Sequence, residues 1–460
     1  MCPPRPKKLK SEEMARFLHI ADVHLGIRRY NLPDRTLDFF QAWREVLERH
    51  AIQRRVDFVL VAGDLFDQRK VDPQAANHAM IMLSELHRQQ IPVVVVEGNH
   101  DQRESASKFS WLRSFSQWGF IKLLEPCWEE GGQIRLDPWD EERRTGSYID
   151  IADTRIFGST WYGTTIGQTL PVLGAAIHEH RRPGATSIVL LHCDIEGQLN
   201  RPIPAALSTT KLAVLRDAVD YIALGHTHKK FAIDGWVFNP GSLEACNVEE
   251  AGVSRGAYLV ETDGPVIKAE FIEAGKDFVQ RPFERLELDI TGDEEPETVG
   301  RRILELVERK LGSPEALVDD ARPIVEVTLR GQLGFRNSML RLDKIKEEAM
   351  DRFKPMGLII NNKTVPKQLA VAVDVSHDAP RLEREVKVIE DLIKPDPRFR
   401  DRASELANLI IEVKRLALER EGPEKMFNLI EQRLFGSPDN ETDATSSESP
   451  SLLAVAEASD

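Results

Sequence analysis

The chain has 460 residues, of which 41% are hydrophobic and 30% charged, so it has room for two or three domains and at least one large core. Its net charge of −14 argues against a protein that coats nucleic acid non-specifically, but it does not exclude DNA binding in a local basic groove. The four cysteines lack Cys-x-x-Cys spacing, which indicates a reducing cytoplasm and neither structural zinc nor a disulfide framework.

No apolar run is long enough to cross a bilayer. The basic N-terminus is not followed by the apolar stretch of a signal peptide. We therefore expect an intracellular protein that does not contact membranes.

The first hundred residues alternate between apolar strands and helices. Each of the strands is short, apolar and rich in β-branched residues, as in a parallel sheet that is buried on both faces. This alternation predicts a layered α/β fold. The expected strands span 17–21, 57–64 and 91–96, and the expected helices span 34–50 and 73–89.

The middle of the chain contains two more buried strands, at 187–191 and 221–224. Residues 120–163 are polar and turn-rich, which indicates short strands and loops. Several short strands follow the second buried strand. The second half of this region is therefore expected to form a second sheet, and the fold class is an α/β two-sheet sandwich flanked by helices.

From residue 283 the pattern predicts a small βαβαβ module, and from about residue 380 it predicts helices separated at Pro395, Pro397 and Gly422-Pro423. Residues after Gly436 are acidic and rich in Ser and Thr, as in disordered tails. The expected division is a flexible arm at 1–16, a large α/β domain at 17–282, a small α+β domain at 283–375, a helical segment at 376–435 and a disordered tail at 436–460.

Five of the apolar strands end in Asp, Asn or His side chains. Taken singly, each is more often a helix cap or a surface residue than a metal ligand. Taken together they indicate a shared site, because strand ends in a layered sheet can meet at one edge. The residues are Asp22, His24, Asp64, Asn99, His100, His192, His226 and His228.

Oxygen and imidazole donors without thiolate suit Mn²⁺, Fe²⁺ or Zn²⁺. Two such ions bridged by a carboxylate bind a phosphate and activate a water for in-line displacement. Asp64 is the candidate bridge, and a protonated histidine beside the ions could give its proton to the leaving oxygen. This predicts phosphoester hydrolysis, in which Cys193 and Cys246 are core or supporting residues rather than nucleophiles.

Five sequence blocks resemble the signature of calcineurin-like metallophosphoesterases over residues 17 to about 245. The blocks are Asp22-x-His24, Gly63-Asp64, Gly98-Asn99-His100-Asp101, His192 and Gly225-His226-Thr227-His228. The resemblance implies a first metal on Asp22, His24, Asp64 and His228, a second on Asp64, Asn99, His192 and His226, and His100 as the catalytic acid.

Within this superfamily the chain resembles the DNA-repair nucleases of the SbcD type, the nuclease subunits of Mre–Rad complexes. The stretches His19–Gly26, Gly63–Asp67 and Asn239–Ser242 carry this similarity together with the Gly98 block. The resemblance implies that 283–375 is a capping domain that contacts DNA and that 376–435 binds a coiled-coil ATPase of the SbcC/Rad type. A helical hairpin that packs on its own domain or self-associates is an equal alternative for the helices.

One position departs from part of that family. Archaeal and eukaryotic members carry a histidine three residues after the bridging aspartate, where this chain has Asp67. Bacterial members carry an aspartate there, so we expect a bacterial cytoplasmic protein. The role of Asp67 stays open.

The resemblance implies a nuclease dependent on two Mn²⁺, with Mg²⁺, Fe²⁺ or Zn²⁺ as other choices. It would act as an exonuclease on duplex ends, in the three-prime to five-prime direction, and as an endonuclease on hairpins and single strands. A homodimer is the usual state of the family. The alternatives are a phosphodiesterase of small nucleotides and a non-catalytic DNA-end scaffold. The candidate DNA-binding residues are Arg28, Arg29, Arg69, Lys70 and Arg103, in the loops beside the metal clusters.

Overall fold

The computed structural model describes residues 14–30, 32–104, 109–199, 206–263, 266–312, 322–367, 381–394, 396–419 and 421–435. It divides into two compact units, one with residues 1–288, 297–329 and 341–362 and the other with 289–296, 330–340 and 363–460. The predicted arm, except for its last residues, and the predicted acidic tail lie outside the described residues. The domain boundaries inferred from the sequence stay predictions.

The first six-stranded sheet holds the three N-terminal strands. Its central strands β1 (Met14–Ile20), β2 (Phe58–Ala62) and β3 (Val93–Val96) pair in parallel, so their carboxyl ends lie at one edge. Strand β13 (Gly256–Asp263) pairs with β1, and β14 (Val266–Glu273) pairs with β13 at that edge of the sheet. Strand β4 (Lys122–Leu123) lies beside β3 at the other edge.

The second six-stranded sheet is built around β9 (Thr186–His192) and β10 (Tyr221–Gly225), which also pair in parallel. It has the order β11-β12-β10-β9-β8-β7. The outer strands are β11 (Phe231–Ile233), β12 (Val237–Asn239), β8 (Thr154–Phe157) and β7 (Tyr148–Ile151).

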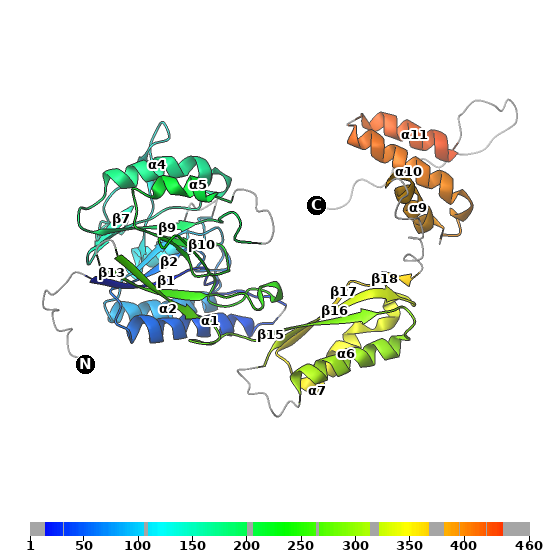
Figure 1. The fold of residues 1–460 in the computed structure, drawn as a ribbon, viewed down its shortest axis with the longest axis horizontal. Coiled ribbons are helices and arrows are strands. Elements are labelled where there is room, and N and C mark those ends of the chain that lie inside the picture. The colour runs from blue at the N-terminus through cyan, green and yellow to red at the C-terminus, as the bar shows by residue number, and fades with distance from the viewer. Residues whose placement is uncertain are drawn as a thin grey trace. The chain divides into compact units, whose positions relative to one another are not determined.

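Three apolar cores hold these layers together. One lies between the two sheets, a second joins the first sheet to its helices, and a third joins the second sheet to its own. In Figure 1, α1 and α2 lie on one side of the sandwich, and α4 and α5 lie on the other. This arrangement confirms the predicted two-sheet sandwich with outer helices. The helices are α1 (Arg35–Val46), which continues as the π-helical η1 (Leu47–Ile52), α2 (Pro73–Arg88), α3 (Trp111–Gln117), α4 (Ile166–Glu179) and α5 (Thr209–Leu212).

The sequence pattern does not predict helix α4. This helix contains Pro171 and two glycines, Gly167 and Gly174, which lower helix propensity. Leu170 and Leu173 are nevertheless fully buried in the core of the second sheet. Tertiary burial therefore outweighs poor local propensity here, and periodicity alone does not reveal it.

The predicted βαβαβ module is present. Its strands follow the order β15-β16-β17, with β16 and β17 parallel, and the short β18 also pairs with β16. The elements are β15 (Phe283–Ile290), α6 (Pro296–Leu311), β16 (Ile324–Leu333), α7 (Leu342–Phe353), β17 (Gly357–Asn362) and β18 (Val365–Pro366).

Three helices follow, as the proline and glycine breaks predict. They are α9 (Arg381–Ile393), α10 (Ala403–Leu418) and α11 (Pro423–Phe435). Helix α10 packs against both α9 and α11 and buries Leu406 and Leu409. Among the described residues, no helix combines the length and the apolar character that a membrane span needs.

Candidate metal centre

Four of the predicted ligand residues have left-handed backbone conformations. Asp22 and His24 follow β1 with φ of 51° and 49°, Asp64 follows β2 with φ of 51°, and His226 follows β10 with φ of 90°. This region is uncommon for residues other than glycine, and such strain concentrates at functional sites. The turns after three strands are thus shaped to direct side chains to one place.

The first half of the cluster lies around two histidines, and we call it the His24–His228 half. Their Nε2 atoms lie 3.0 Å apart. Asp64 Oδ2 lies 3.9 Å from His24 Nε2, and Asp22 Oδ1 lies 4.0 Å from His228 Nε2. These four side chains are the ones that the resemblance assigns to a first metal.

The second half lies around His192 at the end of β9, and we call it the His192–His226 half. His192 Nε2 lies 3.2 Å from Asp64 Oδ2 and 3.2 Å from Asn99 Oδ1. The ring of His226 lies 4.9 Å from that of His192. Asp64 is therefore common to both halves, as a bridging carboxylate must be.

Two glycines leave the space that this cluster needs. A Cβ at Gly98 would lie 2.0 Å from Asp64 Oδ1, and one at Gly63 would lie 2.3 Å from His192 Nδ1. The facing Nε2 atoms of His24 and His228 and the carboxylates beside them form an N/O donor set. These residues fit divalent cations such as Mn²⁺, Fe²⁺ and Zn²⁺.

Four of the predicted ligand histidines each have a protein oxygen atom beside one of their ring nitrogens. These contacts orient the rings and determine which nitrogen carries the proton. The sequence alone does not identify these oxygen partners, although Asp67 and Asp194 could have been noticed because each lies within three residues of a predicted ligand. Glu250 is distant in sequence and carries no such signal. The partners are the Ala62 carbonyl oxygen for His192 (2.8 Å), Glu250 for His228 (3.1 Å), Asp194 for His226 (3.2 Å) and Asp67 for His24 (3.3 Å).

The electrostatics of the cluster favour an ionised bridge. Burial opposes the charge on Asp64, but the neighbouring His192 and His24 hold its pKa far below the usual range. Burial likewise lowers the pKa of His192, and the Asp64 charge more than compensates and raises it to about 9. Burial and the same Asp64 charge raise the pKa of Asp101 to about 8. The Asp64 carboxylate thus stays charged, and its charge disfavours a second charge on Asp101.

Asp101 has a structural role in this loop. Its two oxygens accept hydrogen bonds from the backbone N–H groups of Leu65 and Gly98, both at 2.7 Å. It therefore joins the loop after β2 to the loop after β3.

His100 is held beside the His24–His228 half. Its Nδ1 donates to the backbone oxygen of Asp67 at 2.7 Å, and its backbone N–H donates to Asp64 Oδ1 at 2.9 Å. Its ring packs edge-on against His24 with centroids 4.8 Å apart. Because Nδ1 is engaged, Nε2 is the nitrogen that is left to exchange a proton with a substrate.

The five candidate DNA-binding residues are exposed. Arg69 donates a hydrogen bond to Gln102 at 2.7 Å, close to the His100 loop. Carboxylates lie beside three of the others, which weakens the positive potential that they present. These pairs are Arg28 with Asp72 (3.5 Å), Lys70 with Glu104 (3.8 Å) and Arg103 with Glu125.

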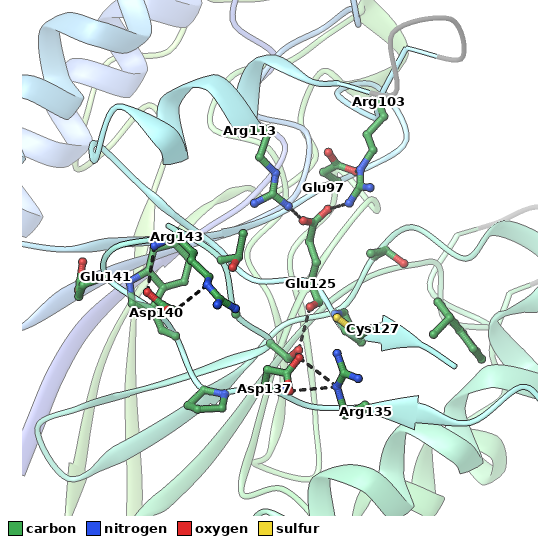
Figure 2. Close-up of a pocket in the computed structure, with 18 of the residues that line it drawn as sticks. Glu97, Arg103, Arg113, Glu125, Cys127, Arg135, Asp137, Asp140, Glu141 and Arg143 are labelled. Carbon is green, nitrogen blue, oxygen red and sulfur yellow. Dashed lines mark hydrogen bonds and ion pairs between the residues drawn. The ribbon is translucent and has the colours of Figure 1, made fainter. Parts of the chain in front are cut away.

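A polar pocket lies beside the cluster. Trp161 lines it, and the Trp161 ring lies 4.7 Å from that of His226. Figure 2 shows Glu125 between Arg103 and Arg113, paired with both. Six acidic side chains and four arginines line the pocket, so the acids outnumber the arginines and the pocket is no ready anion site.

A model of the calcineurin-like phosphoesterase family matches residues 15–230. This range covers the strands from β1 to β10 and every predicted metal ligand. The chain therefore has a calcineurin-like phosphoesterase fold, and it is a metal-dependent phosphodiesterase.

The chain is also similar to several proteins named "DNA double-strand break repair protein Mre11". It is 28% identical to that of Archaeoglobus fulgidus over 72% of this chain and 75% of the relative. It is 28% identical to that of Aeropyrum pernix (60% and 64%) and 25% identical to that of Sulfolobus acidocaldarius (70% and 77%). The resemblance to SbcD/Mre11-type proteins that the sequence motifs indicate is thereby confirmed.

Proposed function

We propose that this protein is a DNA nuclease of double-strand-break repair that uses two divalent ions, Mn²⁺ in particular. The supporting observation is that seven ligand-type side chains from five strand ends meet in two halves that share Asp64. The similarity to Mre11 proteins over most of the chain supports DNA as the substrate.

When bound, the two ions supply phosphate binding and an activated water. His100 gives a proton from Nε2 to the leaving oxygen of the sugar. Asp67 and Asp64 position His100 through its Nδ1 and backbone N–H contacts. Asp22 further fixes the turn after β10, because it accepts the backbone N–H of His226 at 2.9 Å.

The substrate range and the partners are part of the same proposal. The enzyme degrades duplex ends as an exonuclease in the three-prime to five-prime direction, and it cleaves hairpins and single strands as an endonuclease. It works as a homodimer with a coiled-coil SbcC/Rad-type ATPase, which binds the helices α9 to α11. The five basic residues contact the DNA backbone.

The central test is degradation of end-labelled duplex DNA in Mn²⁺ by the wild type and by His100→Ala. We expect the variant to lose ~10²-fold or more in rate, as for removal of a general acid. Mn²⁺ binding should stay intact, because His100 is not one of the ligands. His178→Ala is the matched control, since His178 is exposed on α4.

A parallel assay with a small chromogenic diester distinguishes a DNA nuclease from a small-molecule phosphodiesterase. Cleavage of DNA ahead of the diester supports the nuclease. Cleavage of the small diester alone, with or without the ATPase partner, would instead favour a small-molecule phosphodiesterase. Tight binding of DNA ends without cleavage of either substrate would favour the scaffold.

A further inference from the structure

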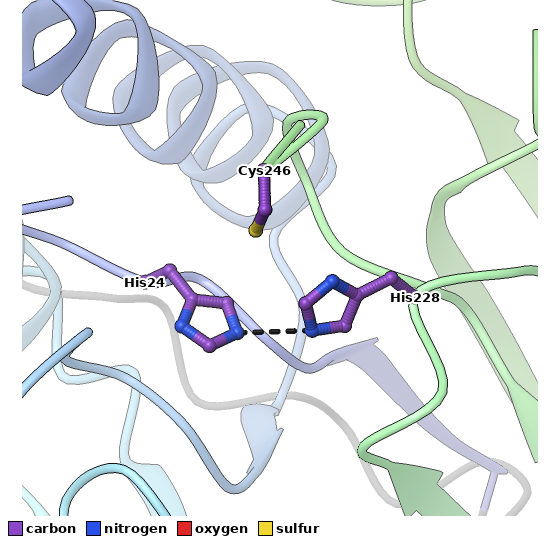
Figure 3. Close-up of side chains that lie close together, drawn as sticks. All are labelled: His24, His228 and Cys246. Atoms are coloured by element: carbon purple, nitrogen blue, oxygen red, sulfur yellow. Dashed lines mark hydrogen bonds between the residues drawn. The ribbon is translucent and has the colours of Figure 1, made fainter. Parts of the chain in front are cut away.

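A cysteine thiol lies beside the His24–His228 half of the cluster. Cys246 is 4% exposed, and its Sγ and one ring nitrogen each of His24 and His228 lie within 4.8 Å of one another. Figure 3 shows the sulfur directed toward the space above the two imidazoles. Thiols are absent from the donor set that the sequence predicts.

The loop that carries this thiol is fixed. The backbone N–H of Cys246 donates to Glu250 Oε2 at 3.0 Å, and Arg255 donates to the same oxygen at 2.8 Å. Arg255 also donates to Ser242 Oγ at 2.8 Å. Since Glu250 holds His228 as well, the thiol and that imidazole are positioned by one carboxylate.

A second observation points to a cation at this place. The Nε2 atoms of His24 and His228 face each other at 3.0 Å. Since Asp67 and Glu250 lie beside the Nδ1 atoms of these two rings, both Nε2 atoms carry lone pairs, which repel each other unless a cation lies between them. His24 is 2% exposed, so solvent does not relieve this repulsion. A cation held between the rings removes the conflict.

We propose that Cys246 supplies a further ligand to the ion of the His24–His228 half, so that this half binds thiophilic ions such as Zn²⁺ and Co²⁺ more tightly than an N/O site would. On binding, the S–H bond breaks, the proton leaves to solvent, and a bond from Sγ to the metal forms. Soft thiolate donors select Zn²⁺ over Mn²⁺, which prefers carboxylate and water. This inference rests on the metal centre of the proposed function.

The test is a Co²⁺ titration of the metal-free full chain in a reductant that contains no thiol. A cobalt–thiolate bond gives a charge-transfer band in the near ultraviolet, whereas cobalt bound by nitrogen and oxygen gives only visible ligand-field bands. We expect the wild type to show both kinds of band. Cys246→Ser should lose the charge-transfer band and retain the visible bands.

Cys193→Ser is the matched control. Cys193 is 3% exposed, comparable to Cys246, but it packs in the apolar core of the second sheet. This variant should keep both kinds of band. In competition titrations, Cys246→Ser should bind Zn²⁺ about tenfold more weakly, with a smaller change for Mn²⁺.

Two results would overturn the inference. Visible cobalt bands in the wild type without a charge-transfer band would remove Cys246 from the coordination sphere and leave the proposed nuclease function untouched. No cobalt bands at all would remove the metal centre, and the proposed function with it. The wild-type spectrum decides both cases, so the test does not depend on the folding of any variant.

Discussion

The two halves of the metal centre differ in what surrounds them. The His192–His226 half is built from β9, β10 and the loop after β3, and a backbone carbonyl holds His192. The His24–His228 half depends on a distant loop that carries Cys246 and Glu250. One half is thus positioned mainly by the strands, and the other by a loop that enters from later in the chain.

This difference suggests where metal specificity is set. Each half has a carboxylate beside an imidazole, which makes that imidazole more basic, but Asp194 lies just after β9 whereas Glu250 belongs to the later loop. The half that contacts the later loop can therefore be tuned without altering the sheets. Three experiments would break or sharpen this contrast.

The largest expected effect is at the residue that both halves share. Asp64→Asn removes the bridging charge, which is worth several kcal/mol of transition-state stabilisation, so DNA cleavage should fall ~10³-fold or more. Steady-state cleavage of labelled duplex measures this loss. Asp263→Asn, at the exposed end of β13, should cleave at the wild-type rate. Full activity of Asp64→Asn would contradict a shared bridge.

The next effect concerns the contact between the two sheets. His19 of β1 is buried and contacts β10 through the Tyr221 hydroxyl at 2.9 Å and the Leu224 carbonyl at 3.1 Å. Burial lowers its pKa to about 3. Protonation therefore favours the unfolded chain, and the stability that neutral His19 contributes is complete above pH 6.5 and is lost as the pH falls toward 3.

Between pH 7 and pH 4, this residue should account for about 3 kcal/mol of lost unfolding free energy. Between the same two pH values, the free energy of unfolding of His19→Gln should fall by about 3 kcal/mol less than that of the wild type, as measured by urea denaturation at both pH values. His178→Gln, at an exposed site, should retain the wild-type difference. Equal pH dependence in all three proteins would show that His19 does not couple the sheets to pH.

The smallest effect separates the halves directly. Glu250→Gln should weaken Mn²⁺ binding at the His24–His228 half by ~10–100-fold and leave the other half unchanged, because the predicted ligand that this carboxylate contacts is His228. Asp194→Asn should do the reverse through His226. The paramagnetic resonance signal of free Mn²⁺ during titration reports both affinities. Parallel losses at both sites in either variant would mean that the halves are not independent.

Local sequence motifs are sufficient to locate much of this centre. The strands that precede Asp22, Asp64 and His192 can be predicted from the sequence, because short apolar runs rich in β-branched residues indicate buried strands without any information about distant contacts. The short helix α3 and the proline-containing α4 cannot, because their burial against the sandwich, and not their local pattern, determines them.

The sequence by itself determined the alternation of strands and helices in the first hundred residues, the two-sheet class and the candidate ligands, since each depends on neighbours in the chain. Only the tertiary structure decided the left-handed turns at Asp22 and Asp64, the carboxylate that holds His228 and the thiol of Cys246 beside the two imidazoles. These features join residues that are distant in the chain or depend on backbone strain. Local patterns do not encode such contacts, because the packing of the two sheets and their loops creates them.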